Sequence, residues 1–395
     1  RTLPQASMAR TLAFAPDGTV LAAGSSDGTA HLWTVSPIDP DEQSAVNKLA
    51  TGGAGGVFAK LGDDGRIQLL RLADSGAWGP PVAVSQISGY DATKGHDLEI
   101  SRDGAYLSVA TSSTGTVDVW NIRDPAKPDP HRRVKVVPGL SAKFIGDRTL
   151  ATLDSSRDLR HPRLQLWDLA ASADSPPVGT WAATATRKTH LLFPKLSVSP
   201  DGRTAALYTR QPGEAATLLD VSDVRAPRPV GAIDVAAHET VSDIDFDGRG
   251  TAAIDGAGGA ALWNVADPRT PTRIAVFAGY TNVSSTAFSP TGRTVAVAAD
   301  DHTIVIWTAA GASWTAADLA KPTAVLTGHT DTVDRMGFAA DGKTLISEGG
   351  GAVRLWSLDA DTSARLACEA AGTPLTEAEW ARGIPGLPFA NYCAA

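Results

Sequence analysis

The sequence predicts an all-β protein built from eight copies of one unit of about four short strands. Three observations support this. Strands of alternating apolar residues return at intervals of 37 to 52 residues, each with a bulky residue near its end. Further apolar runs lie upstream of each of these strands. Turns rich in Gly, Asp and Pro separate the runs. Units of this size and strand content indicate the blades of a β-propeller.

The repeated bulky residues are mostly tryptophans. They are Trp33, Leu70, Trp120, Trp167, Leu219, Trp263, Trp307 and Trp356. Each marks one unit, so we predict eight blades. Seven is the alternative, because the second unit is short and leaves room for only about three strands. Trp181 and Trp314 fall outside the spacing and are predicted to make exposed contacts.

The stretch "GFAADGKT", from Gly337 to Thr344, matches the pattern of a phosphate-binding loop. Such a loop requires a following helix, whereas two short apolar runs around a glycine cluster follow here. The same frame recurs at residues 13–20, 197–204 and 287–294. We therefore interpret it as a repeated turn between two strands.

The two ends of the chain complete the predicted architecture. A propeller must join its last blade to its first or leave an unpaired sheet edge. The N-terminal sequence aligns with the last unit, so residues 1–4 ("RTLP") are predicted to supply the outer strand of the final blade. The propeller is predicted to cover residues 1–358. Residues 359–395 are predicted to form a tail with two short helices that packs on it, the second with Thr376 and Glu379 spaced for a capping box.

These features resemble the WD-repeat (WD40) propeller family over nearly the whole length. The stretches that fit best are "LTGHTDTVDRMGFAADGKTLISEGGGAVRLWSL" and "LAFAPDGTVLAAGSSDGTAHLWTV", and Trp167-Asp168 keeps the dipeptide that gives the family its name. The resemblance implies that His329 forms a hydrogen bond within its own blade. It also implies a binding face made of the loops that lead from each outer strand to the next inner strand.

Those loops contain aromatic and basic residues typical of contact sites. The predicted interaction residues are Tyr90, Arg187, His190, His238, Tyr280, His329 and Arg335. We predict a non-catalytic interaction, scaffold or sensor module that binds a protein or peptide partner through loops held by a rigid framework.

The only two cysteines, Cys368 and Cys393, bracket the tail. A disulfide between them is predicted and would indicate an oxidising compartment, whereas two separate buried thiols are the alternative. The tail also resembles the ending of propellers in large actinobacterial signalling proteins, where a STAND-type NTPase or a kinase precedes the propeller. This resemblance implies an extracytoplasmic domain of a membrane-anchored bacterial protein, with a cytoplasmic location as the alternative.

Composition and motifs argue against several other classes. The net charge is -8 and the basic residues are scattered, so no stripe for nucleic acid is present. No apolar run is long enough to insert into a membrane. The stretch "DIDFDG" opens like a calcium loop, but Ile254 stands where a bidentate glutamate is required. Ser26 in "GSSDG" lies in a predicted turn between strands. We therefore predict no metal, cofactor or catalytic residue.

A propeller enzyme, such as a hydrolase or lyase with a site in the central channel, is the alternative function. It would require acidic residues, histidines or metal ligands on the inner strands. Inner strands such as "STAFS" and "MGFAA" present small and apolar residues instead, and only Asp243 and Asp245 stand out.

Overall fold

In the computed structural model, the chain is divided into two units. The described residues are 9–14, 20–25, 30–34, 46–50, 57–62, 64–71, 82–91, 96–111, 114–135, 141–155, 162–182, 195–209, 211–235, 239–256, 258–280 and 282–359. The first unit comprises Arg1–Gln43, Ala73–Gly79 and Trp356–Ala395. The second, called the ring unit below, comprises Ser44–Leu72 and Pro80–Leu355.

The first unit contains one antiparallel sheet of three strands. Its strands are β1 (Ala9–Phe14), β2 (Val20–Ser25) and β3 (Ala30–Thr34), in the order β1-β2-β3. The repeat marked by Trp33 therefore forms a sheet of its own.

The ring unit is built from seven antiparallel sheets in which each strand pairs with the next in sequence. The first three sheets contain β4 (Val46–Ala50), β5 (Val57–Gly62), β6 (Ile67–Arg71) and β7 (Val82–Ile87); β8 (His96–Ile100), β9 (Tyr106–Thr111), β10 (Thr116–Asn121) and β11 (Asp129–Lys135); and β12 (Ser141–Ile145), β13 (Thr149–Ser155), β14 (Pro162–Asp168) and β15 (Gly179–Ala182). The β4–β7 sheet has four strands, one more than its short repeat suggested.

The other four sheets follow the same plan. They contain β16 (Lys195–Val198), β17 (Thr204–Tyr208), β18 (Ala216–Asp220) and β19 (Arg228–Ile233); β20 (Asp243–Phe246), β21 (Thr251–Gly256), β22 (Gly259–Asn264) and β23 (Thr272–Val276); β24 (Val283–Phe288), β25 (Thr294–Ala299), β26 (Ile304–Thr308) and β27 (Ala324–Leu326); and β28 (Val333–Phe338), β29 (Thr344–Gly349) and β30 (Ala352–Ser357). A 3-10 helix, η2 (Ala316–Leu319), lies between β26 and β27.

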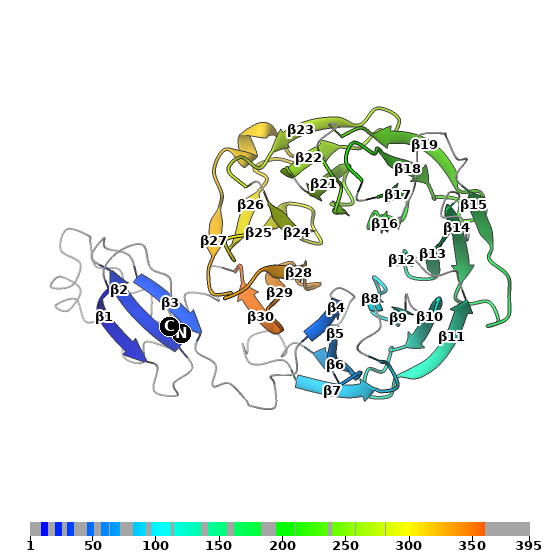
Figure 1. The fold of residues 1–395 in the computed structure, drawn as a ribbon, viewed down its shortest axis with the longest axis horizontal. Helices are drawn as coiled ribbons and strands as arrows, with labels where there is room; N and C mark the ends of the chain where they lie inside the picture. Colours follow the sequence, from blue (N-terminus) through cyan, green and yellow to red (C-terminus); the bar gives the residue numbers. More distant parts are fainter. Residues whose placement is uncertain are drawn as a thin grey trace. The chain divides into compact units, whose positions relative to one another are not determined.

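The seven sheets close into a ring without the β1–β3 sheet (Figure 1). Each inner strand contacts the inner strand of the next sheet, and β28 contacts β4. Phe58 and Leu70 of the β4–β7 sheet pack against Ala339 and Ile346 of the β28–β30 sheet at this closure. The prediction of eight blades is therefore wrong and the seven-blade alternative is correct. Packing between the last sheet and the β4–β7 sheet leaves no place for an eighth.

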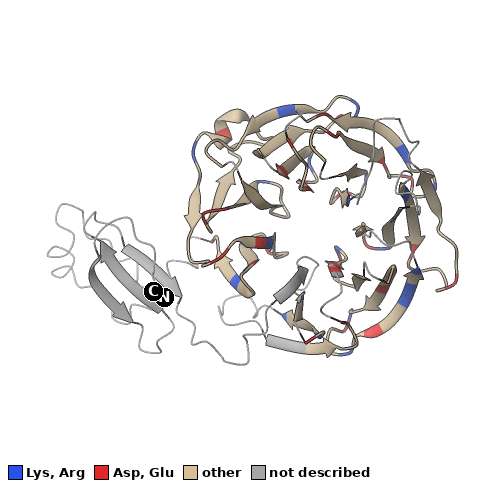
Figure 2. Cartoon of the chain, viewed as in Figure 1, with Lys and Arg blue, Asp and Glu red and all other residues tan. Residues whose placement is uncertain are grey.

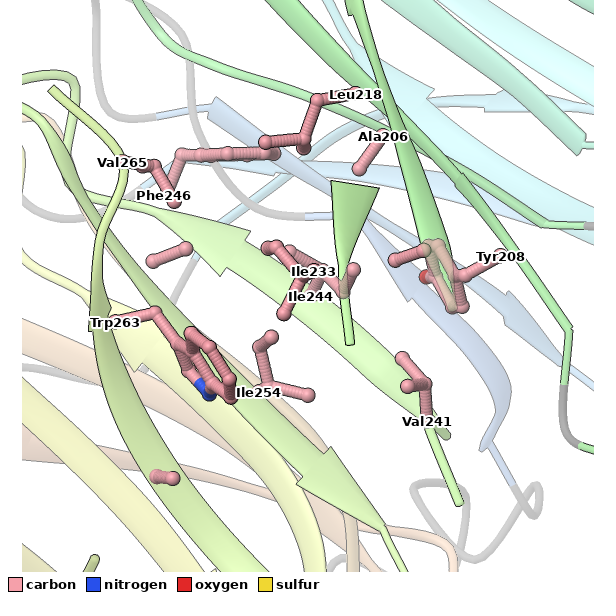
Figure 3. Packing of buried hydrophobic residues seen from close by; sticks show 13 residues of the cluster. Ala206, Tyr208, Leu218, Ile233, Val241, Ile244, Phe246, Ile254, Trp263 and Val265 are labelled. Atoms are coloured by element: carbon pink, nitrogen blue, oxygen red, sulfur yellow. The ribbon is translucent and has the colours of Figure 1, made fainter. Parts of the chain in front are cut away.

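Apolar side chains between neighbouring sheets form the core of the ring. In one such cluster, Ile244 and Phe246 of β20 pack with Ala206 and Leu218 of the preceding sheet (Figure 3). Ile244 is 1% exposed. Similar clusters lie between four other pairs of neighbouring sheets, so the repeated apolar positions of the sequence build these interfaces between blades.

The repeated bulky residues of the ring occupy the third strand of each sheet, as in Trp120 of β10 and Trp167 of β14. Trp181 is partly buried in the outer strand β15. Trp314 is buried, and its Nε1 donates a hydrogen bond to the Gly292 carbonyl oxygen at 2.9 Å. The expectation that Trp314 makes exposed contacts is wrong, because it fills space beside Phe288 instead.

The stretch that resembles a phosphate-binding loop is a turn between β28 and β29. Asp341 accepts hydrogen bonds from the backbone N–H groups of Lys343 and Thr344, at 2.8 and 2.9 Å. The chain continues as the strand β29, so no helix follows it. The interpretation of this stretch as a repeated turn is confirmed.

Several sequence predictions concern residues outside the described ranges. They are the closing strand at residues 1–4, the turn residue Ser26, and the tail from residue 360, with its predicted helices and the predicted bridge between Cys368 and Cys393.

Candidate functional site

Six inner strands of the ring can be aligned on one structural row. Each of these strands carries an apolar residue at an equivalent position. In β8 this residue is Ile100, which pairs with Leu107 of the second strand, and Leu107 pairs in turn with Trp120, the bulky residue of the third strand. The positions one and three residues before this apolar residue share one face of the strand, because side chains alternate. These two positions hold most of the charged residues of the inner strands.

The nearer position holds Glu99, Lys143, Ser197, Asp245, Ala287 and Gly337, and the farther one holds Asp97, Ser141, Lys195, Asp243, Ser285 and Arg335. Figure 2 shows charged residues on inner strands around the centre of the ring. Six of them interact with one another and are called the axial group below. The axial group consists of Asp97, Glu99, Lys143, Asp243, Asp245 and Arg335.

Glu99 and Lys143 form the ion pair at the centre of the axial group. The Lys143 Nζ lies 2.6 Å from the Glu99 Oε2, and the side chains are 29% and 26% exposed. Burial raises the pKa of Glu99, and the charge of Lys143 opposes this. Burial alone would lower the pKa of Lys143, but the surrounding carboxylates, Glu99 first, hold it above its ordinary value. Lys143 is therefore firmly charged.

The electrostatic interactions of Lys143 extend beyond the neighbouring sheet. Asp243 on β20 also raises the pKa of Lys143, although β16 separates β20 from β12 around the ring. Asp243 accepts a hydrogen bond from the hydroxyl of Tyr208 at 2.6 Å. The axial residues therefore face one common space rather than separate interfaces.

Asp245 is a second carboxyl of the group whose pKa is raised. Burial raises this pKa to about 7, and the neighbouring charge of Asp243 adds to the effect. The backbone N–H of Phe288 donates to Asp245 Oδ2 at 2.6 Å, which favours the charged form. The Asp245 carboxyl therefore changes its protonation near neutral pH.

Polar side chains also link successive inner strands. Ser197 Oγ donates to the carbonyl oxygen of Ile244 in the next sheet. Ser284 Oγ donates to the carbonyl oxygen of Val333 at 2.7 Å. Arg335 reaches past β4 to β8 and lies 3.1 Å from Asp97 Oδ1. These links fix the inner strands relative to one another and so hold the axial group in place.

Part of the axial group lies near one face of the ring. Chain connections from outer strands enter each inner strand at its first residue, and we call the face where the inner strands begin the entry face. Asp243 is the first residue of β20, and Asp97 is the second residue of β8. Asp334, beside Arg335, is exposed there. The entry face is the one on which the sequence predicted the binding loops.

Two of the predicted interaction residues take part in packing. Tyr90 is partly buried, and its hydroxyl accepts a hydrogen bond from Trp120 Nε1 at 2.9 Å and donates to Asp118 Oδ2 at 3.3 Å. Burial raises the pKa of Tyr90 above its ordinary value. The ring of Tyr280 meets that of Trp307 edge-on, with centroids 5.6 Å apart. Both tyrosines support the tryptophan of a blade and leave part of their surface exposed.

His329 and Arg335 differ in accessibility. His329 is 7% exposed, and its Nε2 lies 2.7 Å from Ser347 Oγ in its own blade, the kind of contact that the WD-repeat resemblance implies. Burial, with the nearby charge of Arg354, lowers the pKa of His329 to about 4, so the ring is neutral at pH 7. Arg335 is 35% exposed and joins the axial group through Asp97.

The structure does not bring the predicted residues together as one cluster. Tyr90 and Tyr280 lie in connections of sheets that are not neighbours in the ring. Arg187, His190 and His238 lie outside the described residues.

Sequence reasoning missed Glu99 and Lys143. It expected small and apolar inner strands, which holds for Ala287 and Gly337 but not for the strands that carry the charges. Aligning the inner strands on their turns would have shown charged residues at equivalent positions.

Two further findings concern the described part of the chain. There, no group of three or more His, Cys, Asp or Glu side chains is placed to hold a metal ion. A search of the same residues finds no helix with the length and apolar character needed to cross a membrane.

Comparisons with known proteins agree with this architecture. Residues 2–34, 271–308 and 320–357 match the family described as "WD domain, G-beta repeat" (WD40). The second stretch covers β23 to β26, and the third covers β27 to β30. The chain therefore carries WD40 repeats and is a β-propeller.

A chain of the hydrazine synthase of Kuenenia stuttgartiensis is similar in structure. The TM-score is 0.60, with 12% sequence identity over 82% of this chain and 99% of that chain. At this identity the likeness shows the fold alone. In all, 1642 chains of solved structures match, and a fold shared so widely hosts unrelated functions. A search of curated protein sequences gave no match.

Proposed function

We propose that this protein is a non-catalytic interaction or sensor module that binds a protein or peptide partner at the entry face of its ring. WD40 propellers generally mediate protein interactions, which supports the class of function. The observation that carries the proposal is the axial group, in which charges of both signs are fixed on the inner strands, with Asp97, Asp243 and Arg335 nearest the entry face.

The arrangement of the group favours recognition over stability. Its side chains are partly exposed, so the ion pairs add little to the free energy of unfolding. Fixed charges of both signs can select a partner with the complementary pattern and speed its encounter. Asp334 and Asp243 are exposed at the same end and extend the charged surface.

Charge reversal at the entry face tests the proposal. The full chain, with an affinity tag, is used to retain partners from a lysate of the source cells. We expect the Asp334→Lys variant to lose the protein that the wild type retains. Asp129 is an exposed acid at the start of the outer strand β11, near the opposite face, so Asp129→Lys is the matched control. Equal retention by wild type, Asp334→Lys and Asp129→Lys would overturn the proposed site.

A propeller enzyme with its site at the ring axis is the second candidate. The specific observation in its favour is Asp245, whose pKa of about 7 suits a general base at neutral pH. Turnover of chromogenic ester or glycoside substrates, with an inflection near pH 7 that disappears in Asp245→Asn, would favour this candidate. A rate equal to that of buffer across the substrate panel would reject it for those reactions.

We further propose that the module is part of a larger bacterial signalling protein and lies outside the cytoplasm. The resemblance of the tail and the two cysteines support this. Mass mapping of an unreduced digest tests the compartment: a peptide linking Cys368 to Cys393 is expected. Two free thiols in protein isolated from its source would instead favour the cytoplasmic alternative.

A further inference from the structure

A cavity of about 190 Å³ lies between the β4–β7 and β8–β11 sheets, away from the axial group. Its apolar wall is formed by Val57, Ala105 and Ile122, which are at most 7% exposed. Val57 begins β5 and Arg71 ends β6, which places the cavity at the face where the inner strands end. This face is opposite the entry face, so the cavity is independent of the proposed function.

Two arginines from neighbouring sheets line this cavity. Arg71 comes from the β4–β7 sheet and Arg123 follows the strand β10 of the next sheet. Among the described residues, Arg71 has no ion pair or side-chain hydrogen bond, and the guanidinium of Arg123 has no ion pair. Two guanidinium groups that line one cavity without ion-pair partners can bind a shared anion.

Contacts within and between the two sheets fix the walls of the cavity. The Arg123 guanidinium carbon stacks over the ring of Tyr106, 5.4 Å from its centroid, and Tyr106 is itself 8% exposed. Ser85 of β7 donates a hydrogen bond to the carbonyl oxygen of Pro125, which joins the two sheets beside the cavity. The stacking restricts the Arg123 side chain before any ligand binds.

Asp103 is the one acidic residue that lines the cavity. Its Oδ1 accepts hydrogen bonds from Ser101 Oγ at 2.7 Å and from the backbone N–H of Ala105 at 3.0 Å. This carboxylate is used to form the turn between β8 and β9. With Arg71 and Arg123, the lining keeps an excess of one positive charge.

We propose that this cavity binds a phosphate group between Arg71 and Arg123. A phosphate offers several oxygens to two planar guanidinium groups, and the volume accommodates a ligand of several heavy atoms. The phosphate can be inorganic or can belong to a phosphomonoester.

Calorimetric titration of the full chain at constant ionic strength tests the proposal. The probes are inorganic phosphate and O-phosphoserine. We expect a dissociation constant of about 1 mM or tighter for at least one of them. Arg71→Gln and Arg123→Gln should each weaken binding by about tenfold. Arg203→Gln is the matched control, because Arg203 is exposed on a turn at the same face and does not line the cavity.

The outcomes separate the sources of the phosphate. Binding of both probes supports a general phosphate site, whereas binding of O-phosphoserine alone supports a site for a phosphorylated ligand. No binding of either probe by the wild type overturns the proposal. So does binding that Arg71→Gln and Arg123→Gln leave unchanged, or that Arg203→Gln weakens equally. Circular dichroism verifies that each variant is folded.

Discussion

The two faces of the inner strands differ in composition and in role. One face is apolar: Ile244 and Phe246 of β20 pack into the cluster shared with the preceding sheet. The other face is polar: Asp243 and Asp245 of the same strand belong to the axial group. Fold and candidate site are thus carried by alternate residues of one strand, because successive side chains point to opposite faces.

The residues on the two faces also follow different rules. On the apolar face, most inner strands carry a buried apolar side chain at the equivalent position, as Ile100, Phe246 and Phe288 show. On the polar face, charged residues pair with partners in other sheets, as Glu99 pairs with Lys143. Four predictions test this division, beginning with the largest expected effect.

Shortening a side chain on the apolar face should destabilise the ring most. Ile244→Ala is expected to lower the free energy of unfolding by about 3 kcal/mol, because it leaves a cavity at a site that is 1% exposed. Asp243→Ala on the polar face of the same strand should cost about 1 kcal/mol, mainly through the lost bond from Tyr208. Urea unfolding followed by tryptophan fluorescence measures both. Equal costs would remove the distinction between the faces.

The second prediction concerns the pH dependence of Asp245. Its pKa of about 7 in the folded protein lies above the unfolded value near 4, so folding favours the protonated form. The wild type should therefore lose stability as the pH rises from about 4 to 7. The stability of Asp245→Asn relative to wild type should grow by about 2.5 kcal/mol between pH 5 and pH 8. Unfolding curves at pH 5 and pH 8 test this, and a difference independent of pH would contradict it.

The third prediction addresses the ion pair of Glu99 and Lys143. Lys143→Met should destabilise by about 1.5 kcal/mol, because the neighbouring carboxylates lose their cation. Glu99→Gln combined with Lys143→Met should cost less than the sum of the single variants. A double-mutant cycle from denaturant unfolding gives the coupling. Strict additivity would show that the pair does not act as one element.

The smallest effect is expected at the exposed end of the axial group. Arg335 and Asp97 are about one third exposed, so Arg335→Gln should change the unfolding free energy by about 0.5 kcal/mol or less. Added salt should reduce the difference further. Thermal unfolding at low and high salt provides the measurement. A large loss of unfolding free energy that persists in high salt would show that Arg335 stabilises the fold through packing rather than through its charge.

The sequence predicted the apolar residues of the inner strands, because these residues recur in each repeat. The periodic tryptophans predicted the sheets. The recurring eight-residue pattern that contains Asp341 predicted the turns between strands. The number of blades was not predicted correctly, because the Trp33 repeat has the same local pattern as the others. Whether a sheet joins the ring depends on long-range packing, here between Phe58 and Ile346.

The candidate site was less predictable for a related reason. Lys143 and Glu99 are 44 residues apart, and Arg335 and Asp97 are 238 residues apart. Packing of neighbouring sheets places Lys143 beside Glu99, whereas closure of the ring brings Arg335 to Asp97, and these charges do not follow the repeat. Tyr90 and His329 have side chains of the types found in contact sites, yet packing uses them inside their blades.

Replacing the ion pairs of the polar face together tests the division of roles most directly. The variant Asp97→Asn, Glu99→Gln, Lys143→Met, Arg335→Gln removes both pairs without opening a cavity on the apolar face. We predict a melting temperature within a few degrees of wild type and loss of the partner retained by the full chain. Retention of that partner as by wild type, or melting far below it, would contradict the account.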